Sequence, residues 1–321
     1  MIPTRRLDLR HDLTPAQLLQ CLASGGLAAV PTETVYGLAA DATNGDAVAR
    51  IFEAKGRPTF NPLISHVADL AMAREHALFD ETALRLAAHF WPGPLTMVLP
   101  LRPGSAIHPL ALGGLSTVAL RMPQGPLRDA VAALGRPVAA PSANRSGRVS
   151  PTDADHVLRT LEGRIGLVVD GGPTAQGLES TIVRAETDRI VLLRPGTITA
   201  ADLEAATGLP VVRRADGERI DAPGQLLSHY APHGSVRLNA DTPRAEEYWI
   251  AFGAAQAAGH PPERVFQLSA RGDLREAASR LFAALSAFDS PDIDQIAVAT
   301  IPTEGLGEAI NDRLRRAAAD R

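Results

Sequence analysis

The chain has 321 residues, of which 45% are hydrophobic and 21% are charged, so it is long and apolar enough to form two packed domains. This composition argues against a disordered chain. The formal net charge of -4 and the isoelectric point of about 6.1 exclude a protein that holds nucleic acid through a global positive field, so any contact with RNA must be local or indirect.

Few signals in the sequence bear on its cellular compartment. The one cysteine, Cys21, excludes an internal disulfide and the usual multi-thiolate zinc site. No apolar run approaches the roughly 20 residues that a membrane span requires, and the N-terminus lacks the apolar core of a signal peptide. We therefore expect a cytoplasmic protein with no membrane contact.

From about Leu13 to Leu209, short apolar runs alternate with helical patterns, which is typical of an α/β domain. Because several of the strands follow one another without a long helix between them, we expect a mixed sheet. The expected strands are Leu27–Val30, Leu63–Val67, Thr96–Leu101, Thr117–Met122, Val138–Ala140, Leu167–Val169, Thr181–Arg184 and Ile190–Leu193.

Two helix starts in this region carry recognisable capping signals. Ser150 is expected to cap a helix whose first residue is Pro151. Thr199 and Asp202 are expected to form the capping box of another helix.

Between Pro210 and Gly234 the periodicity fails while proline, glycine and arginine accumulate, which predicts a linker. A second alternation of strands and helices follows and predicts a small three-layer βα domain. Its expected strands are Ser235–Leu238, Val265–Leu268 and Ile296–Thr300, with helices from Pro243, Asp273 and Gly305. The predicted division is a large α/β domain over 11–209, a linker over 210–234 and a small α/β domain over 235–321.

His229 and His233 have the i, i+4 spacing of some zinc ligands. Pro232 lies between them and argues against a helix there, and no third ligand is apparent. We therefore expect no metal site built by the protein alone.

Lys55 is the only lysine among the 32 lysine and arginine residues. A chain that otherwise uses arginine favours lysine only where a compact ammonium is needed and a planar guanidinium would not fit. The alternative is chance retention of a lysine at a solvated helix end.

The chain has no P-loop motif, so any nucleotide that it binds must be held by another arrangement. Three polar segments offer one. Residues 31–38 form a hydroxyl-rich turn after a strand, and residues 140–151 add hydroxyl, amide and arginine donors that suit phosphate and ribose oxygens. In 55–63, Lys55 and Arg57 lie on a loop stiffened by two prolines, so both cations can converge on one anion. Each segment alone is also compatible with an ordinary turn.

Taken together, these segments and three others closely resemble the YrdC-like family in order and spacing, and the linker and second domain resemble its longer, two-domain members. The resemblance covers nearly the whole chain. The matching stretches are Pro31-Thr32-Glu33-Thr34-Val35-Tyr36-Gly37, Lys55-x-Arg57-Pro58-x-x-Asn61-Pro62-Leu63, Trp91-Pro92-Gly93-Pro94-Leu95-Thr96, Ala140-Pro141-Ser142-Ala143-Asn144, Glu179-Ser180-Thr181, Leu193-Arg194-Pro195-Gly196, Ala222-Pro223-Gly224 and His229-Tyr230-Ala231-Pro232.

The resemblance implies a twisted mixed sheet with flanking helices, a small Rossmann-like C-terminal domain and the activity of a nucleotidyltransferase. In that activity ATP, L-threonine and bicarbonate or carbon dioxide give threonylcarbamoyl-AMP and pyrophosphate, with Mg²⁺ held mainly by the ATP phosphates. A separate transferase complex then uses the adenylate to make threonylcarbamoyladenosine in tRNA. A weak direct contact with tRNA is also compatible with the resemblance.

The resemblance also assigns residues. It implies that Arg121 pairs with the threonine carboxylate and that the linker, through Tyr230, forms a lid over the ATP site. The residues implied in catalysis are Lys55, Arg57, Ser142 and Asn144. Those implied in ATP binding are Arg57, Asn61, Thr117, Ser142, Ser150, Arg194 and Tyr230, and those implied in threonine binding are Thr34, His66, Arg121, Ala140 through its backbone, and Ser180.

Two other functions stay open at this point. A carbamoyl transferase that uses carbamoyl phosphate can be built on the same domain, although such proteins resemble larger chains with cysteine-rich zinc modules. A non-catalytic RNA-binding protein would need a cationic face, for which the acidic composition gives little support.

Overall fold

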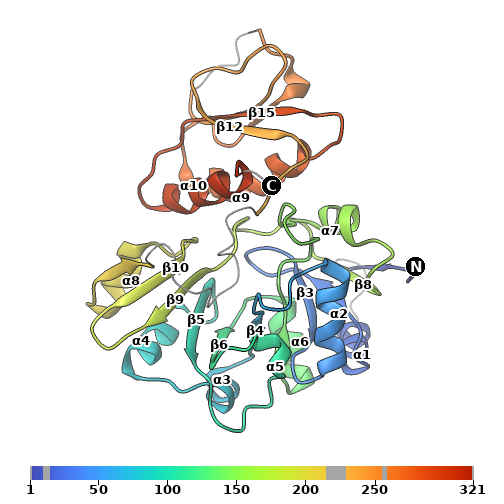
Figure 1. Ribbon diagram of the computed structural model, residues 1–321, viewed down its shortest axis with the longest axis vertical. Coiled ribbons are helices and arrows are strands. Elements are labelled where there is room, and N and C mark those ends of the chain that lie inside the picture. The colour runs from blue at the N-terminus through green and yellow to red at the C-terminus, as the bar shows by residue number, and fades with distance from the viewer. Residues whose placement is uncertain (1, 10–14, 215–228, 255–258, 320–321) are drawn as a thin grey trace.

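The computed structural model describes residues 2–9, 15–214, 229–254 and 259–319, and in these residues it forms two sheets (Figure 1). The larger sheet has eleven strands: β1 (Arg5–Asp8), β2 (Ala28–Val30), β3 (Gly37–Asp41), β4 (Ile64–His66), β5 (Leu95–Pro100), β6 (Thr117–Arg121), β7 (Val138–Ala139), β8 (Leu167–Asp170), β9 (Thr181–Ala185), β10 (Ile190–Arg194) and β11 (Val211–Arg213). The helices that accompany it are α1 (Pro15–Ala23), α2 (Gly45–Lys55), α3 (Leu70–His76), α4 (Glu81–Phe90), α5 (Pro109–Leu112), α6 (Pro126–Leu134), α7 (Ala154–Leu161) and α8 (Ala200–Thr207).

The larger sheet is mixed, as the sequence predicts. Its strand order is β1-β8-β2-β3-β7-β4-β6-β5-β9-β10-β11. Strand β6 runs parallel to β4 and antiparallel to β5, whereas β9 runs parallel to β5 and antiparallel to β10. All eight strands expected in this part are present, each with both ends within one residue of the predicted bounds. The prediction missed β1, β3 and β11.

Alternation along the strands divides the core between the two faces of this sheet. Ala28 and Val30 pack with Leu22 of α1 and Val131 of α6, whereas Ala29 belongs to the main core on the other face. A third cluster, centred on β4, β6, β5, β9 and β10, contains strand residues alone. One of its members, Ile64, also lines the cavity described below.

The helix ends that position the predicted site obey local rules, with one correction. Gly56 ends α2 in the left-handed region at φ 62°, which turns the chain after Lys55. The capping box of Thr199 and Asp202 is present at the start of α8. The helix expected from Pro151 is wrong, because α7 begins at Ala154 and Asp153, whose side chain accepts from His156 N, is its cap. The Ser150 hydroxyl is thus free for another partner.

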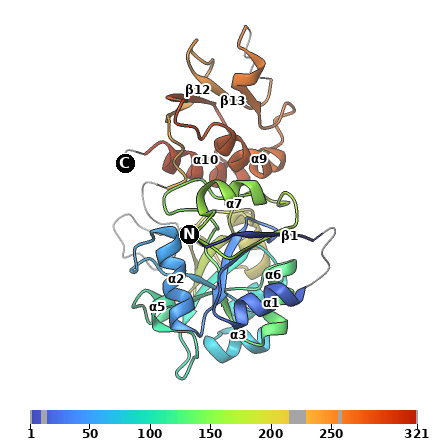
Figure 2. The ribbon, with the colours of Figure 1, turned by 90° about the vertical axis from the view of Figure 1, so that its right-hand side faces the viewer.

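The smaller sheet contains four parallel strands in the order β12 (Ser235–Ala240), β15 (Gln295–Ala299), β13 (Tyr248–Ala251) and β14 (Val265–Gln267). Helices α9 (Leu274–Ala287) and α10 (Leu306–Ala317) follow the predicted starts at Asp273 and Gly305, and a short 3-10 helix, η1, covers Pro262–Arg264. The helix expected from Pro243 is wrong, since residues 241–247 form turns that lead into β13. The three-layer expectation is also wrong for the described residues, because α9 and α10 lie on the same face of this sheet (Figures 1 and 2).

Helices α9 and α10 lie between the two sheets, with the larger sheet below them in both views (Figures 1 and 2). The core of the smaller part includes Val35, Val149 and Leu178 from loops of the larger part, together with Tyr230. The two parts therefore share one continuous apolar junction. Strands β1 and β11 extend the larger sheet beyond the expected limits at 11 and 209. Within the expected linker, residues 215–228, with Ala222-Pro223-Gly224, lie outside the described residues.

Candidate active site

The candidate site is a cavity of about 50 Å³ at the junction, where β4, β6, β10 and the residues just before β9 meet the segment that begins at His229. Eight of the fourteen residues that the resemblance assigns line it, and they come from seven separate segments of the chain. The lining predicted residues are Arg57, His66, Arg121, Ala140, Ser142, Ser180, Arg194 and Tyr230. The fold thus brings most of the predicted site to one place.

Arg57 is held in the turn after α2 by its own loop. Its Nη2 donates to Asn61 Oδ1 (2.7 Å) and to the Pro62 carbonyl (2.8 Å), and its Nε donates to the Asn61 carbonyl (3.1 Å). Asn61 is buried and does not line the cavity. Its contribution in this structure is to fix the guanidinium of Arg57.

Lys55 is buried at the end of α2, so chance retention at a solvated helix end is wrong. Its Nζ donates to the carbonyls of Ser142 (2.6 Å) and Asn144. Burial and the charge of Arg57 lower the pKa of this ammonium well below its usual value. Lys55 does not line the cavity; it holds the loop whose Ser142 does. Two carbonyls that converge on one point suit the compact ammonium of lysine better than a planar guanidinium.

Arg194, at the end of β10, also lines the cavity. Its Nε and Nη2 donate to the Ser180 carbonyl (3.1 and 2.9 Å), and Nη2 also reaches Ser180 Oγ (3.1 Å). Ser180 Oγ lies 2.7 Å from Thr96 Oγ1, so the hydroxyl predicted to bind threonine is held from two sides.

The cavity has an excess of buried positive charge. Burial, together with the charge of Arg194, lowers the pKa of Arg57 to about 10, and burial also lowers the pKa of Arg194. Among the described residues that line the cavity, Glu179 is the one carboxylate. Since uncompensated buried charge is unfavourable, this arrangement is suited to a ligand with several negative charges.

Glu179 is occupied by partners on both of its oxygens. Oε1 accepts from Ser150 Oγ (2.6 Å), and Oε2 accepts from Arg313 Nε (2.9 Å) of α10. Burial raises the pKa of this carboxyl, but the charges of Arg313 and Arg194 and the hydrogen bond from Ser150 outweigh it and lower the pKa to about 2. Ser150, predicted to contact ATP, is therefore fully buried behind the cavity wall and supports Glu179 in this structure.

Arg121, at the end of β6, already has a carboxylate partner. Its Nη2 lies 2.7 Å from Glu33 Oε1, and its Nε donates to the Gly93 carbonyl (3.2 Å). Glu33 Oε2 in turn accepts from Gln124 N (3.0 Å). These contacts fix the plane of the guanidinium through Nη2 and Nε, and neither of them involves Nη1. The sequence reasoning missed this role of Glu33.

His66 faces Arg121 across the β4–β6 pair and is fully buried. Burial, and then the charge of Arg121, lowers the pKa of the imidazole to about 3. His66 is therefore neutral at neutral pH, and its Nδ1 has no hydrogen-bond partner in the part of the chain that is described.

We predict that this depressed pKa makes the chain less stable in mild acid. Below about pH 6.5, His66 binds a proton in the unfolded chain but stays unprotonated in the folded chain. The contribution of His66 to the free energy of unfolding therefore falls as the pH drops from 6.5 towards 3. The loss reaches about 2–3 kcal/mol at pH 4.5. Urea unfolding at several pH values gives the free energy of unfolding as a function of pH. This free energy should depend less steeply on pH in His66→Gln than in the wild type, whereas His89→Gln, at an exposed position, should keep the wild-type slope. Equal slopes in His66→Gln and the wild type would contradict the prediction.

Tyr230 and His229 close the cavity from the linker side. Tyr230 is buried and has a φ of 64°, in the left-handed region that a non-glycine residue rarely adopts. Its ring packs against Phe282 of α9 (5.2 Å between centroids), and the guanidinium of Arg313 lies 5.5 Å from its centre. The C-terminal part therefore holds the linker tyrosine against the cavity.

The other predicted residues lie further from the cavity. Thr34 is fully buried, and its hydroxyl lies 2.8 Å from that of Thr32. Asn144 is in the loop held by Lys55, with a buried Oδ1 that has no hydrogen-bond partner among the described residues. Thr117 is on the same face of β6 as Arg121 but at the other end, roughly 13 Å away.

Comparisons with known proteins agree along the length of the chain. The Sua5, YciO and YrdC family model, described as "Telomere recombination", matches residues 20–196, and the model described as "Threonylcarbamoyl-AMP synthase, C-terminal domain" matches residues 198–319. The Bacillus subtilis (strain 168) protein named threonylcarbamoyl-AMP synthase is 41% identical over 328 residues, which cover 97% of this chain and 94% of the relative. The Pyrococcus abyssi protein of the same name is 40% identical over 94% of this chain and 92% of its own length.

The solved structure of P. abyssi Sua5 complexed with L-threonine has a TM-score of 0.86 and 36% sequence identity, and the match covers 98% of this chain and 97% of that one. The agreement therefore includes both sheets and the junction that contains the cavity. The chain belongs to the Sua5, YciO and YrdC family, in the form that carries the C-terminal domain of threonylcarbamoyl-AMP synthases.

Proposed function

We propose that the chain makes threonylcarbamoyl-AMP and pyrophosphate from ATP, L-threonine and bicarbonate or carbon dioxide. The observation that carries this proposal is the buried cavity in which two arginines with depressed pKa values, Arg57 and Arg194, face Arg121. The names of the full-length relatives and the threonine complex of the P. abyssi protein support the same reaction.

The residues suit a reaction that depends on positioning. The neutral amine of threonine adds to carbon dioxide and releases one proton to solvent, which gives a carbamate. An oxygen of this carbamate attacks the α-phosphorus of ATP. The bond between that phosphorus and the bridging oxygen to the β-phosphate breaks, and pyrophosphate leaves with the bond's electron pair. Arg57 and Arg194 neutralise the negative charge that develops on the phosphate, and Arg121 Nη1 binds the threonine carboxylate. His66 is neutral, so it does not form an ion pair with the negatively charged carbamate. No protein nucleophile is required.

Magnesium would enter with the nucleotide. Among the described residues there is no group of three or more histidine, cysteine, aspartate or glutamate side chains that could hold a metal ion, and the Glu179 carboxylate is already paired. The residues present therefore fit an ion held by the ATP phosphates, with the unpartnered Asn144 Oδ1 available to it. Bound in this way, the ion would neutralise the charge of the leaving pyrophosphate.

The cavity is small compared with the roughly 300–1,000 Å³ of typical small-molecule sites, so ATP does not fit beside His229 and Tyr230 in their present positions. We propose that the linker assigned to residues 210–234 acts as a lid: these two residues withdraw to admit ATP and return to shield the hydrolysable adenylate.

Downstream, we propose that a threonylcarbamoyl transferase complex takes the adenylate to modify tRNA, with at most weak direct tRNA contact by this chain. The described residues contain no helix that is both long and apolar enough to cross a membrane. A cytoplasmic location fits this role in tRNA modification.

The test is pyrophosphate release from ATP by the purified chain, with threonine and bicarbonate each present or omitted. Release that requires both, with a threonylcarbamoyl-AMP product confirmed by mass spectrometry, is the expected result. Release without threonine, or none under any combination, would reject the proposal. Release with carbamoyl phosphate in place of threonine and bicarbonate would favour the carbamoyl transferase instead.

A further inference from the structure

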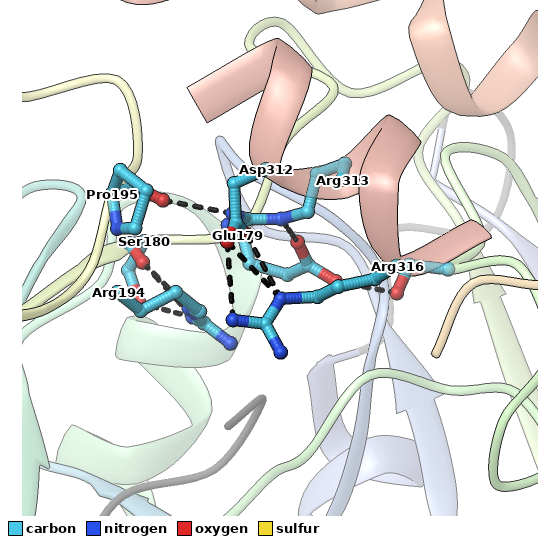
Figure 3. A network of polar contacts seen from close by, with 8 residues as sticks. Glu179, Ser180, Arg194, Pro195, Asp312, Arg313 and Arg316 are labelled. Carbon is cyan, nitrogen blue, oxygen red and sulfur yellow. Dashed lines mark hydrogen bonds and ion pairs between the residues drawn. The ribbon is translucent and has the colours of Figure 1, made fainter. Parts of the chain in front are cut away.

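The C-terminal part places one side chain directly behind the wall of the catalytic cavity. Arg313 of α10 has no exposed surface, although it comes from outside the larger sheet. An arginine is almost never fully buried unless it is paired. Its Nε donates to Glu179 Oε2 (2.9 Å), and its Nη1 donates to the Pro195 carbonyl (2.9 Å) and to Asp312 Oδ2 (2.7 Å) (Figure 3).

The two segments that Arg313 holds both carry predicted ligand residues. Glu179 immediately precedes Ser180, and Pro195 immediately follows Arg194. Arg194 itself donates to the Ser180 carbonyl, so the two segments and Arg313 form a closed ring of polar contacts (Figure 3). Removing Arg313 opens this ring behind the cavity.

Glu179 links Arg313 to the segment that carries Ser150. Its other oxygen accepts from Ser150 Oγ (2.6 Å), while Glu179 itself lines the cavity and Arg313 does not. Arg313 also lies 5.5 Å from the centre of the Tyr230 ring, which is part of the cavity lining. Its Nη2 is buried without a hydrogen-bond partner in the described residues. Arg313 thus stands one layer behind two lining groups.

We infer that Arg313 is a positioning residue for the proposed adenylate synthesis: it holds Glu179 and Pro195 so that Arg194 is oriented for ATP, and the C-terminal domain thereby completes the active site. This inference rests on the proposed function. Arg313 acts through Glu179 and touches no substrate.

A purely structural role is separable, because the chain offers a second ion pair between the same two parts. Arg213 of β11 donates to Glu308 of α10 through Nε (2.6 Å) and Nη2 (2.9 Å), but its side chain is 64% exposed and neither residue lines the cavity. Arg213→Met therefore removes a contact between the parts without touching the Glu179 network.

The experiment is a double-mutant cycle of Arg313→Met, Glu179→Gln and the double variant in the full-length chain, with Arg213→Met as control. Steady-state pyrophosphate release gives kcat and KM for ATP, and thermal unfolding gives stability. We expect Arg313→Met to lower kcat/KM for ATP by about 10–100-fold, as losses of supporting contacts behind a site do. The double variant no longer leaves a charged Glu179 without Arg313, and it should recover most of the thermal stability.

Because Arg313 acts through Glu179, the loss in the double variant should exceed the larger single loss by no more than about threefold. Three results would overturn the inference. The first is a loss of kcat/KM in the double variant equal to the product of the two single losses, and the second is a return of kcat/KM together with thermal stability in the double variant. The third is a loss of kcat/KM in Arg213→Met equal to that in Arg313→Met. Should Arg313→Met fail to fold, Arg313→Lys keeps the charge but its ammonium has no fork to serve both Glu179 and Pro195, and the same loss is expected.

A pH profile adds a readout that domain docking alone would not move. Arg313→Met removes the strongest counter-charge of Glu179, so kcat/KM for ATP should fall in acid at a higher pH than in the wild type, and Glu179→Gln in the same chain should abolish that fall. The charged and titratable groups around this carboxyl are Arg313 and Asp312 of α10, Arg194 of β10, Lys55 of α2, and His229 and Tyr230.

If the wild-type chain releases no pyrophosphate, the proposed function fails independently. The Arg313 inference is then decided by calorimetric titration with Mg-ATP: weaker binding in Arg313→Met than in Arg213→Met supports it, and equal binding overturns it.

Discussion

Arg121→Met is expected to lower kcat/KM for L-threonine by about 10²–10³-fold while the KM for ATP stays within about twofold of the wild type. The reason is that Arg121 is the cavity cation whose Nη1 is left for a carboxylate, after Glu33 and the Gly93 carbonyl have taken its other nitrogens. Pyrophosphate release measured over a range of threonine concentrations, at saturating ATP and bicarbonate, gives the ratio.

Two companion variants separate binding from folding. Arg121→Met leaves the buried Glu33 unpaired and should cost about 3–5 kcal/mol of stability, whereas Glu33→Gln/Arg121→Met should recover most of it without recovering threonine use. Arg128→Met, which removes an arginine of α6 whose Nε donates to the Ala68 carbonyl, is the control and should behave as wild type. A threonine KM close to wild type in Arg121→Met would show that the carboxylate is bound elsewhere.

Arg194→Met is expected to lower kcat/KM for ATP by about 10²-fold or more, with a smaller effect on the KM for threonine. Arg194 carries one of the like charges that the cavity buries at a cost, and a phosphate chain supplies the missing counter-charge. Its contact with the Ser180 carbonyl is the source of the smaller effect on threonine.

Arg184→Met is the matched control, because Arg184 lies on the same hairpin, pairs with Glu186 and does not line the cavity. Calorimetric titration with Mg-ATP checks that the loss is in binding. A change confined to threonine, with unaltered ATP binding, would reassign Arg194 to the amino-acid side of the site.

The strands that the sequence revealed are those with apolar or β-branched runs. Strand β3, Gly37-Leu38-Ala39-Ala40-Asp41, was missed because small residues carry little strand signal, although all five are buried. A helix was expected from Pro243 because proline is common in the first turn of a helix. Strand pairing overrides it, since Trp249 and Ile250 become fully buried when β13 inserts between β15 and β14. Such pairing is set by residues distant in the chain.

The residues of the site also fall into those that local sequence motifs reveal and those whose roles depend on contacts between distant parts of the chain. Motif residues such as Arg57, Arg121 and Arg194 could be assigned because the resemblance supplied them, and the fold does bring them to one cavity. Nothing local distinguishes Arg313 from the other arginines of α10, and Glu33 appears as one carboxylate in a polar turn. Their roles arise from contacts across 134 and 91 residues of sequence, to Glu179 and Gln124 respectively.

The single lysine has a consequence for how this protein can be modified. Apart from the α-amino group of the chain, Lys55 is its only primary amine, and its Nζ is enclosed by two carbonyls. The surface therefore offers no lysine to acetylating or ubiquitin-conjugating enzymes. An acylating reagent can reach this amine only when the loop around Ser142 has moved away from Lys55. The extent of labelling at Lys55 therefore measures the fraction of molecules in which this loop is open.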